Sequence, residues 1–365
     1  MKFIDEYRDG MLARTLVGRI TEVSKKPVRL MEICGTHTMA IFMHGIRSVL
    51  PDHIELISGP GCPVCVTAIE DIDRSIQLSK QPNVIVTTFG DMLRVPGTDS
   101  SLQNENGRGA DVRMVYSSFD ALKIAEDNPK KEVTFLGIGF ETTAPTVAAA
   151  VKTARDRNLS NFSALSVHKL LPPAMNALIS GGDLYVDGFM CPGHVSTIIG
   201  TSSYETIAAN YQIPCVVVGF EPIDILQGIL MLVEQIENGL ARVEIQYERA
   251  VRPEGNPHAL RIMDEVFQPC NSLWRGLGMI SGSGLSIKDP FTSHDAAQRF
   301  NLAVPPAKEP PGCRCPEVLR GAIRPLECNL FRKVCSPRNP IGACMVSSEG
   351  TCAAYYKYHH SNDEG

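Results

Sequence analysis

The chain has 365 residues, of which 44% are hydrophobic, and its formal net charge is −5. Such a length can bury a sizeable core and predicts two or three domains. The absence of a net positive charge argues against nucleic acid or an anionic membrane as the main partner. No apolar run approaches the length of a membrane span, and the first residues include early acids but no apolar signal core, so we expect a cytoplasmic protein.

Strand-like and helix-like segments alternate through the first two thirds of the chain. Residues 4–24 carry apolar side chains at helical spacing and predict one amphipathic helix. Short β-type runs then follow, each leading into a polar or glycine-containing loop and a helical stretch, which is typical of parallel α/β domains. Four runs begin near residues 28, 54, 84 and 112, and four more near residues 133, 162, 186 and 215.

The predicted fold class is α/β, with two similar parallel-sheet domains over residues 28–125 and 131–240. Ligands of open parallel sheets bind beyond the carboxyl ends of the strands, so we expect the two domains to face one cleft. Residues 1–27 and 241–365 are predicted to form a third, mainly helical domain with loops and a cysteine-rich tail. Its segment 304–311 contains four prolines and predicts a semi-rigid connector to that tail.

The most distinctive local motif is Gly59-Pro60-Gly61-Cys62-Pro63-Val64-Cys65, which follows a short apolar run. Two cysteines separated by two residues can close a disulfide, contribute half of a metal site, or do each in turn. Structural zinc usually takes four ligands, and the sequence has no second C-x-x-C motif, so redox chemistry or an open metal site is favoured. A buried structural pair is the alternative.

Several polar residues also follow predicted strands, where loop side chains can reach a ligand. They are His37, His168, His194, Glu141 and Glu221. Each histidine is equally well explained by a hydrogen bond to a loop backbone group, and each glutamate by a favourable place at a helix start. A dinucleotide site is disfavoured, because the glycines around residue 138 lack the G-x-G-x-x-G spacing and the sequence has no Walker lysine loop.

Half of the twelve cysteines fall in the tail, at positions 313, 315, 328, 335, 344 and 352. In a reducing compartment this enrichment favours metal or redox work over a framework of disulfides. Taking Cys315, Cys328, Cys335 and Cys352 as ligands leaves gaps of 12, 6 and 16 residues. These gaps do not match a zinc ribbon and would let separate loops converge on a four-iron cluster. Zinc and purely structural thiols are the alternatives.

Five motifs together resemble the HypD hydrogenase maturation proteins. They are CGTHT from Cys34, GPGCPVC from Gly59, GFETT from Gly139, PGHVS from Pro192 and MVSSEG from Met345, in the order that the family has them. The resemblance extends over nearly the whole chain. It implies a scaffold on which the iron of nickel-iron hydrogenase receives two cyanides and one carbon monoxide. It also implies two partners, a small HypC-type chaperone and a HypE-type cyanide donor.

The resemblance also implies roles for the cysteines. Cys34 would bind the iron together with a cysteine of the HypC-type chaperone, and Cys62 and Cys65 would be the redox-active or iron-binding pair. A [4Fe-4S] cluster would be held by Cys315, Cys328, Cys335 and Cys352, leaving Cys313 and Cys344 as extras. His37 could hydrogen-bond an iron-bound cyanide or tune the Cys34 thiolate. Glu141 and His194 complete the candidate catalytic set.

The chemistry of these residue types agrees with that implication. Soft thiolates suit a low-spin iron with strong-field ligands, and a cluster supplies single electrons that a dithiol accumulates as a pair. A cluster-fed thiol-disulfide oxidoreductase is the alternative function, although it leaves Cys34 and His37 without a role. A structural zinc protein would explain only the tail.

Overall fold

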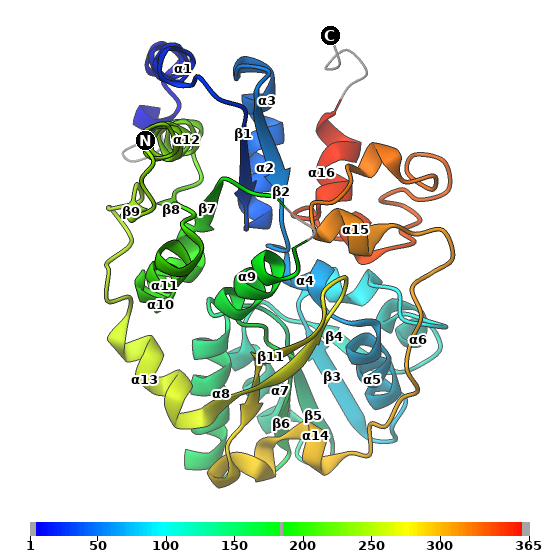
Figure 1. Cartoon of the computed structure of the whole chain (residues 1–365). Coiled ribbons are helices and arrows are strands. Elements are labelled where there is room, and N and C mark those ends of the chain that lie inside the picture. The colour runs from blue at the N-terminus through cyan, green and yellow to red at the C-terminus, as the bar shows by residue number, and fades with distance from the viewer. Residues whose placement is uncertain (1–4, 183–184, 360–365) are drawn as a thin grey trace.

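The computed structural model describes residues 5–182 and 185–359, and within these ranges the chain forms two parallel sheets and one antiparallel pair of strands (Figure 1). The first sheet has the order β2 (Ile54–Ser58), β1 (Val28–Glu32), β7 (Gly188–Pro192), β8 (Cys215–Val218) and β9 (Val243–Ile245). The second has the order β4 (Asp111–Met114), β3 (Val84–Thr88), β5 (Glu132–Gly137) and β6 (Phe162–Ser166). The antiparallel pair is β10 (Phe267–Trp274) and β11 (Gly278–Ile287).

Helices connect the parallel strands, because a parallel pair needs a long crossover. The α-helices are α1 (Gly10–Val23), α2 (Gly35–Met43), α3 (Ile46–Val49), α4 (Pro63–Val66), α5 (Ile69–Ser79), α6 (Leu102–Gly107), α7 (Ser118–Asp127), α8 (Ala144–Asp156), α9 (Leu171–Ser180), α10 (Gly193–Ile199), α11 (Ser202–Tyr211), α12 (Pro222–Glu237), α13 (Pro257–Val266), α14 (Ala296–Arg299), α15 (Cys315–Leu319) and α16 (Thr351–Tyr358). Short 3-10 helices are η1 (Asp5–Tyr7), η2 (Gly90–Arg94), η3 (Asp289–His294), η4 (Pro325–Glu327) and η5 (Ala343–Met345).

Local sequence explains why these elements form where they do. Every residue of β3 and of β8 is buried, as expected for strands covered on both faces, and both are rich in β-branched residues. The amino end of α12 is fixed by Pro222 in its first turn and by mutual capping between Glu221 and Asp224. Helix α1 begins at the N-cap Asp9 and packs on α12, so the predicted amino-terminal helix is confirmed over Gly10–Val23. Residue 4 of that prediction lies outside the described ranges.

The eight predicted strand runs all contain strands, but their assignment to two consecutive sheets is wrong. Strands β1 and β2 pair with β7 and β8 in the first sheet, whereas β3 and β4 pair with β5 and β6 in the second. Each predicted domain, 28–125 and 131–240, therefore contributes two strands to each sheet. The error has a physical cause, because an apolar run identifies a strand without identifying its neighbour in the sheet.

The expected cleft between the sheets is also different in the structure. The carboxyl ends of both sheets point to the centre of the molecule, where α4 and α9 lie (Figure 1). There Cys65, Phe140 and Trp274 belong to one buried hydrophobic cluster, and the rings of Phe140 and Trp274 stack with centroids 6.0 Å apart. At these residues the two sheets meet in a packed core rather than across an open cleft.

The prediction of a mainly helical segment after residue 241 is wrong for its middle part. Strands β10 and β11 form a bulged hairpin there, anchored by Trp274, whose indole N–H donates to Ser283 Oγ at 2.8 Å. Glycine and serine at alternating positions hid the strand pattern of β11, since they supply little apolar periodicity.

The cysteine-rich tail packs beside the first sheet, with α16 against α2 (Figure 1). It consists of loops and short helices, as predicted, and residues 301–310 before it form no regular element. Among the helices of the described ranges, none combines the length and the apolar character needed to cross a membrane.

Candidate functional site

Cys34 lies at the carboxyl end of β1 and is the N-cap residue of α2, with 7% of its surface exposed. Burial, and next the carboxylate of Glu349, raise the pKa of its thiol to about 12, although the nearby backbone N–H groups of His37 and Thr36 oppose the shift. The thiol is therefore protonated at neutral pH. A bound cation would supply the charge that the thiolate needs, and its binding would release a proton.

Cys62 and Cys65 form a disulfide across the first turn of α4, with their Cα atoms 5.2 Å apart. Their loop follows β2, the strand next to β1, and the Gly35 N–H donates to the Gly61 carbonyl at 3.0 Å. An added Cβ at Gly61 would lie 2.1 Å from the backbone nitrogen of Cys34. The two cysteine loops thus lie side by side, because they follow paired parallel strands.

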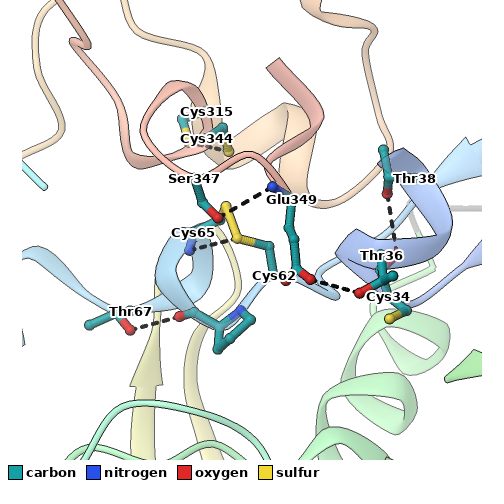
Figure 2. Close-up of a disulfide and its surroundings, with 11 residues drawn as sticks. Cys34, Thr36, Thr38, Cys62, Cys65, Thr67, Cys315, Cys344, Ser347 and Glu349 are labelled. Atoms are coloured by element: carbon teal, nitrogen blue, oxygen red, sulfur yellow. Dashed lines mark hydrogen bonds between the residues drawn. A yellow bond between two sulfur atoms is a disulfide. The ribbon is translucent and has the colours of Figure 1, made fainter. Parts of the chain in front are cut away.

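A loop of the tail closes over this pair of loops (Figure 2). The Thr36 hydroxyl donates to Glu349 Oε1 at 2.6 Å, and the Glu349 N–H donates to Ser347 Oγ at 3.3 Å. A Cβ on Gly35 would lie 2.5 Å from that of Glu349, so glycine is needed for this approach. Sequence reasoning assigned no chemistry to Glu349, and the only signal for it was its place in the motif that begins at Met345.

A stack of three rings joins two of the predicted histidines, His37 of α2 and His194 of α10. Phe220 lies between His37, at 4.8 Å between centroids, and His194, at 3.9 Å. His37 is fully buried, which lowers its pKa to about 4, whereas His194 is exposed on the outer side of the stack. The two candidates are therefore brought together by Phe220, a residue that sequence reasoning passed over.

The tautomer of His37 follows from its contacts. Its Nε2 lies 2.9 Å from the Gly219 carbonyl and 3.1 Å from that of Val218, and carbonyls only accept, so Nε2 carries the proton. Nδ1 is buried and has no hydrogen-bond partner. Neutral His37 therefore offers no free donor to a cyanide nitrogen, and the contact predicted from sequence needs another donor. Its side chain instead ties α2 to the end of β8.

Glu32 and Ser58, the last residues of β1 and β2, lie behind the cysteine loops. Glu32 is fully buried, which raises the pKa of its carboxyl to about 8. The Thr38 hydroxyl donates to its Oε1 at 2.8 Å, and its Oε2 has no hydrogen-bond partner. A neutral carboxylic acid thus lies two residues before Cys34, and no sequence signal distinguished it from an ordinary strand residue.

Glu141 belongs to a different place, at the carboxyl end of β5. Its Oε1 accepts from the Leu171 N–H at 2.9 Å, and burial raises its pKa to about 7. It lines a cavity of about 500 Å³ together with residues of α9, α11 and α13. His168, likewise buried, bonds through Nδ1 to Ser166 Oγ at 3.0 Å. Each of the two residues also has one buried polar atom without a hydrogen-bond partner, Glu141 Oε2 and His168 Nε2.

The tail cysteines converge on one apolar cavity, also lined by Val318, Leu330, Phe331 and Met345. All six thiols line it: Cys313, Cys315, Cys328, Cys335, Cys344 and Cys352. The placement does not single out the predicted four, since the Sγ atoms of Cys315 and Cys344 are only 2.7 Å apart. In the described part of the chain no three His, Cys, Asp or Glu side chains already form a metal site, so binding a metal requires these loops to adjust.

The cavity nevertheless fits an iron-sulfur cluster by the chemistry of its donors. Its polar lining side chains are all thiols, which soft metals prefer. The Ile341 N–H points at the Cys335 sulfur at 3.4 Å, a contact of the kind that tunes cluster thiolates. A Cβ on Gly342 would lie 2.8 Å from Cys313 Sγ, so the bare backbone there leaves room for the thiols.

The cavity and the disulfide are neighbours. The 3-10 helix η5, which contains Cys344, packs against α4, which contains Cys65, and all three cysteine groups flank the Ser347–Glu349 loop in Figure 2. Cys65, Cys315 and Cys344 belong to one buried cluster. The structure therefore places the cysteine cavity next to the disulfide, and the disulfide loop next to Cys34.

Comparisons with known proteins are consistent along the whole chain. The HypD family model, described as the hydrogenase formation hypA family, matches residues 11–359. The chain is 48% identical over 367 residues to the hydrogenase maturation factor HypD of Azotobacter vinelandii, covering 98% of this chain and 97% of that protein. It is 44% identical over 374 residues to the hydrogenase maturation factor HypD of Escherichia coli K12, covering 100% of both chains.

Proposed function

Since the chain belongs to the HypD family of hydrogenase formation proteins, we propose that it is the scaffold on which the iron of nickel-iron hydrogenase is built up with its two cyanides and one carbon monoxide. In this proposal the iron is a substrate, held by Cys34 and a cysteine of a HypC-type chaperone. A HypE-type protein donates the cyanide. The protein works in the reducing cytoplasm, where its free thiols persist.

The observation that carries the proposal is the environment of Cys34. The thiol ends a strand, lies at a helix amino terminus, and is 7% exposed beside a disulfide loop. Two backbone N–H groups favour the thiolate, while burial and Glu349 oppose it, so the sulfur is prepared for a cation. The neighbouring Gly35 is buried under Glu349, so the approach of a second protein chain to Cys34 requires the Ser347–Glu349 loop to move.

The tail supports a redox part of the same function. Cys315, Cys328, Cys335 and Cys352 would hold a [4Fe-4S] cluster, which supplies one electron at a time when bound. Reducing the Cys62–Cys65 disulfide takes two electrons and two protons, breaks one S–S bond and leaves two thiols. An external one-electron donor must therefore deliver twice for each disulfide reduced.

Infrared spectroscopy tests the scaffold proposal directly. The purified complex with the HypC-type chaperone should show cyanide and carbonyl stretching bands, and Cys34→Ala should lack them while keeping its tail cluster. Cys215→Ala is the matched control, because it removes another buried thiol from β8 of the same sheet. Undiminished bands in the Cys34→Ala complex would overturn the assignment of the iron ligand.

A series of serine variants tests the cluster ligands. Serine at position 315, 328, 335 or 352 should sharply reduce iron and inorganic sulfide, whereas Cys313→Ser and Cys344→Ser should leave both unchanged. Cys344 is the strongest competitor to the predicted ligands, because it is 1% exposed and in contact with Cys315. If Cys344→Ser loses iron and one of the four predicted variants keeps it, Cys344 is a ligand in place of that cysteine.

The alternative function is a cluster-fed thiol-disulfide oxidoreductase. It is favoured by one observation, the formed Cys62–Cys65 disulfide packed against the cysteine cavity. Under this alternative Cys34→Ala would retain reductant-dependent reduction of a partner disulfide, and the iron bands would be absent even from the wild-type complex. Measuring the infrared bands and the reduction of a partner disulfide on the same preparation distinguishes the scaffold from the oxidoreductase.

A further inference from the structure

A buried arginine connects the disulfide to the cysteine cavity. The Arg275 side chain is 2% exposed, and its backbone N–H donates to the Val66 carbonyl at 2.8 Å. Val66 is the residue after Cys65, and the next pair along, Thr67 and Trp274, forms a β-bridge. Arg275 is therefore fixed directly to the short helix that carries the disulfide.

On its other side the same segment touches the cavity. Gly276 has φ of +83°, and a Cβ there would lie 2.8 Å from the Pro316 carbonyl oxygen. Pro316 is the residue after Cys315, one of the thiols that line the cavity. The Arg275–Gly276 segment thus lies directly against the loop that carries a cavity thiol.

The charge of Arg275 is only partly neutralised within the protein. Its nearest carboxylate is Glu309, with Nε and Oε1 3.4 Å apart, longer than a normal charge-assisted hydrogen bond. Arg275 Nε and Glu309 Oε2 have no hydrogen-bond partner. A buried cation is costly unless an anion compensates it, and the thiolates of a loaded cavity would supply that anion.

We propose that Arg275 is a positioning residue that raises the reduction potential of the group held by the cavity thiols and so adjusts electron delivery to the Cys62–Cys65 pair. The proposal rests on the proposed function for the presence of that group. A nearby positive charge stabilises the state that carries one more electron, and net charge is one of the factors that set cluster potentials. Glu309, with the opposite charge, should have the opposite effect.

The test is a redox titration of the anaerobically purified full-length protein, followed by electron paramagnetic resonance. Arg275→Gln should shift the oxidised-to-reduced ratio at a fixed potential about tenfold toward the oxidised form, or ~59 mV lower for one electron. Glu309→Gln should shift it toward the reduced form. Arg275→Lys, which keeps the charge, should stay near the wild type.

Arg314→Gln is the matched control. Arg314 directly precedes Cys315 in sequence, but its side chain is 39% exposed and paired with Glu317 at 3.1 Å, so solvent screens its charge. A shift in Arg314→Gln as large as that in Arg275→Gln would overturn the proposal, as would unchanged potentials in both Arg275→Gln and Glu309→Gln. If Arg275→Gln fails to hold iron, the Glu309→Gln variant tests the proposal alone: a shift toward the reduced form supports it, and a shift toward the oxidised form overturns it.

The outcomes also separate this proposal from the proposed function. Wild-type protein without iron and inorganic sulfide after anaerobic purification would contradict the cluster itself. If the wild-type protein shows the paramagnetic resonance signal but substitutions at residues 275 and 309 leave its reduction potential unchanged, only the role of Arg275 is contradicted.

Discussion

The contact between the two cysteine loops can be tested by adding one methyl group at Gly61. Its ideal Cβ would lie 2.1 Å from Cys34 N and 2.4 Å from Cys34 Cα, and both atoms are backbone. Reaching an ordinary contact of 3.4 Å from 2.1 Å requires the loops to separate by 1.3 Å. Gly61→Ala should therefore push the disulfide loop away from Cys34.

The expected cost combines two effects. Overpacking of this kind typically costs about 1–3 kcal/mol. Loss of the hydrogen bond from Gly35 N–H to Gly61 O, 3.0 Å long, adds about 0.5–1.5 kcal/mol. We expect Gly61→Ala to lower the free energy of unfolding by about 2–4 kcal/mol. Because a displacement near 1 Å can cost about 10²-fold in rate, iron loading should fall at least that steeply.

Urea unfolding and the infrared bands of the chaperone complex measure the two effects. Gly18→Ala is the matched control, because Gly18 lies inside α1 and its added Cβ meets nothing within 4 Å. That variant should gain about 0.5–1 kcal/mol and load iron normally. A Gly61→Ala protein as stable as the wild type and equally loaded with iron would refute the role assigned to this contact.

Three further predictions concern other buried groups. Burial raises the pKa of Glu32 to about 8, so the contribution of its protonated carboxyl to stability is lost as pH rises from about 4.5 through 8. Glu32→Gln should therefore flatten the pH dependence of the urea midpoint between these values. An unchanged slope would contradict this prediction. Lys169→Met should cost about 1.5–3 kcal/mol in urea unfolding, because it removes a buried cation that lies 3.2 Å from Asp71 and donates to Ser272 and Leu273, although Arg74 still pairs with Asp71; a loss below about 1 kcal/mol would count against a structural ion pair. Cys62→Ala and Cys65→Ala should abolish hydrogenase maturation in cells. Each should lower the free energy of unfolding by no more than about 2 kcal/mol, since the disulfide closes only a short loop. Global unfolding of either variant would instead indicate a structural pair.

Local patterns in the sequence were sufficient to find eight of the nine strands that form the two parallel sheets of the described residues, and they missed β9 (Val243–Ile245). They also led us to expect polar loops at the carboxyl ends of the strands, and the structure then brings the Cys34 and Cys62 loops together because it pairs β1 with β2. They did not identify which strands share a sheet, since pairing depends on crossovers that leave no local trace. The hairpin β10–β11 was missed for a related reason, because its glycines and serines carry no clear periodicity.

The rest of the candidate site is assembled from distant parts of the chain. Glu349 meets Thr36 across 313 residues, and Arg275 meets Val66 across more than two hundred. Nothing in a single sequence links such positions, so sequence reasoning named the thiols but not the groups that set their charge. His37 shows the converse case, because its residue type suggested a donor and its backbone contacts make it a fixed neutral ring.

The interleaving of the two sheets has a consequence for how the protein is made. Strands β3 to β6 are consecutive, so the second sheet can form as soon as residues 84–166 have emerged from the ribosome. The first sheet must wait for β7, which follows β2 by 130 residues, the difference between positions 58 and 188. At about 5–20 residues per second this interval lasts about 7–26 s. During that time β1 and β2 lack their third strand, and the contact between Thr36 and Glu349 forms only after residue 349 has been synthesised.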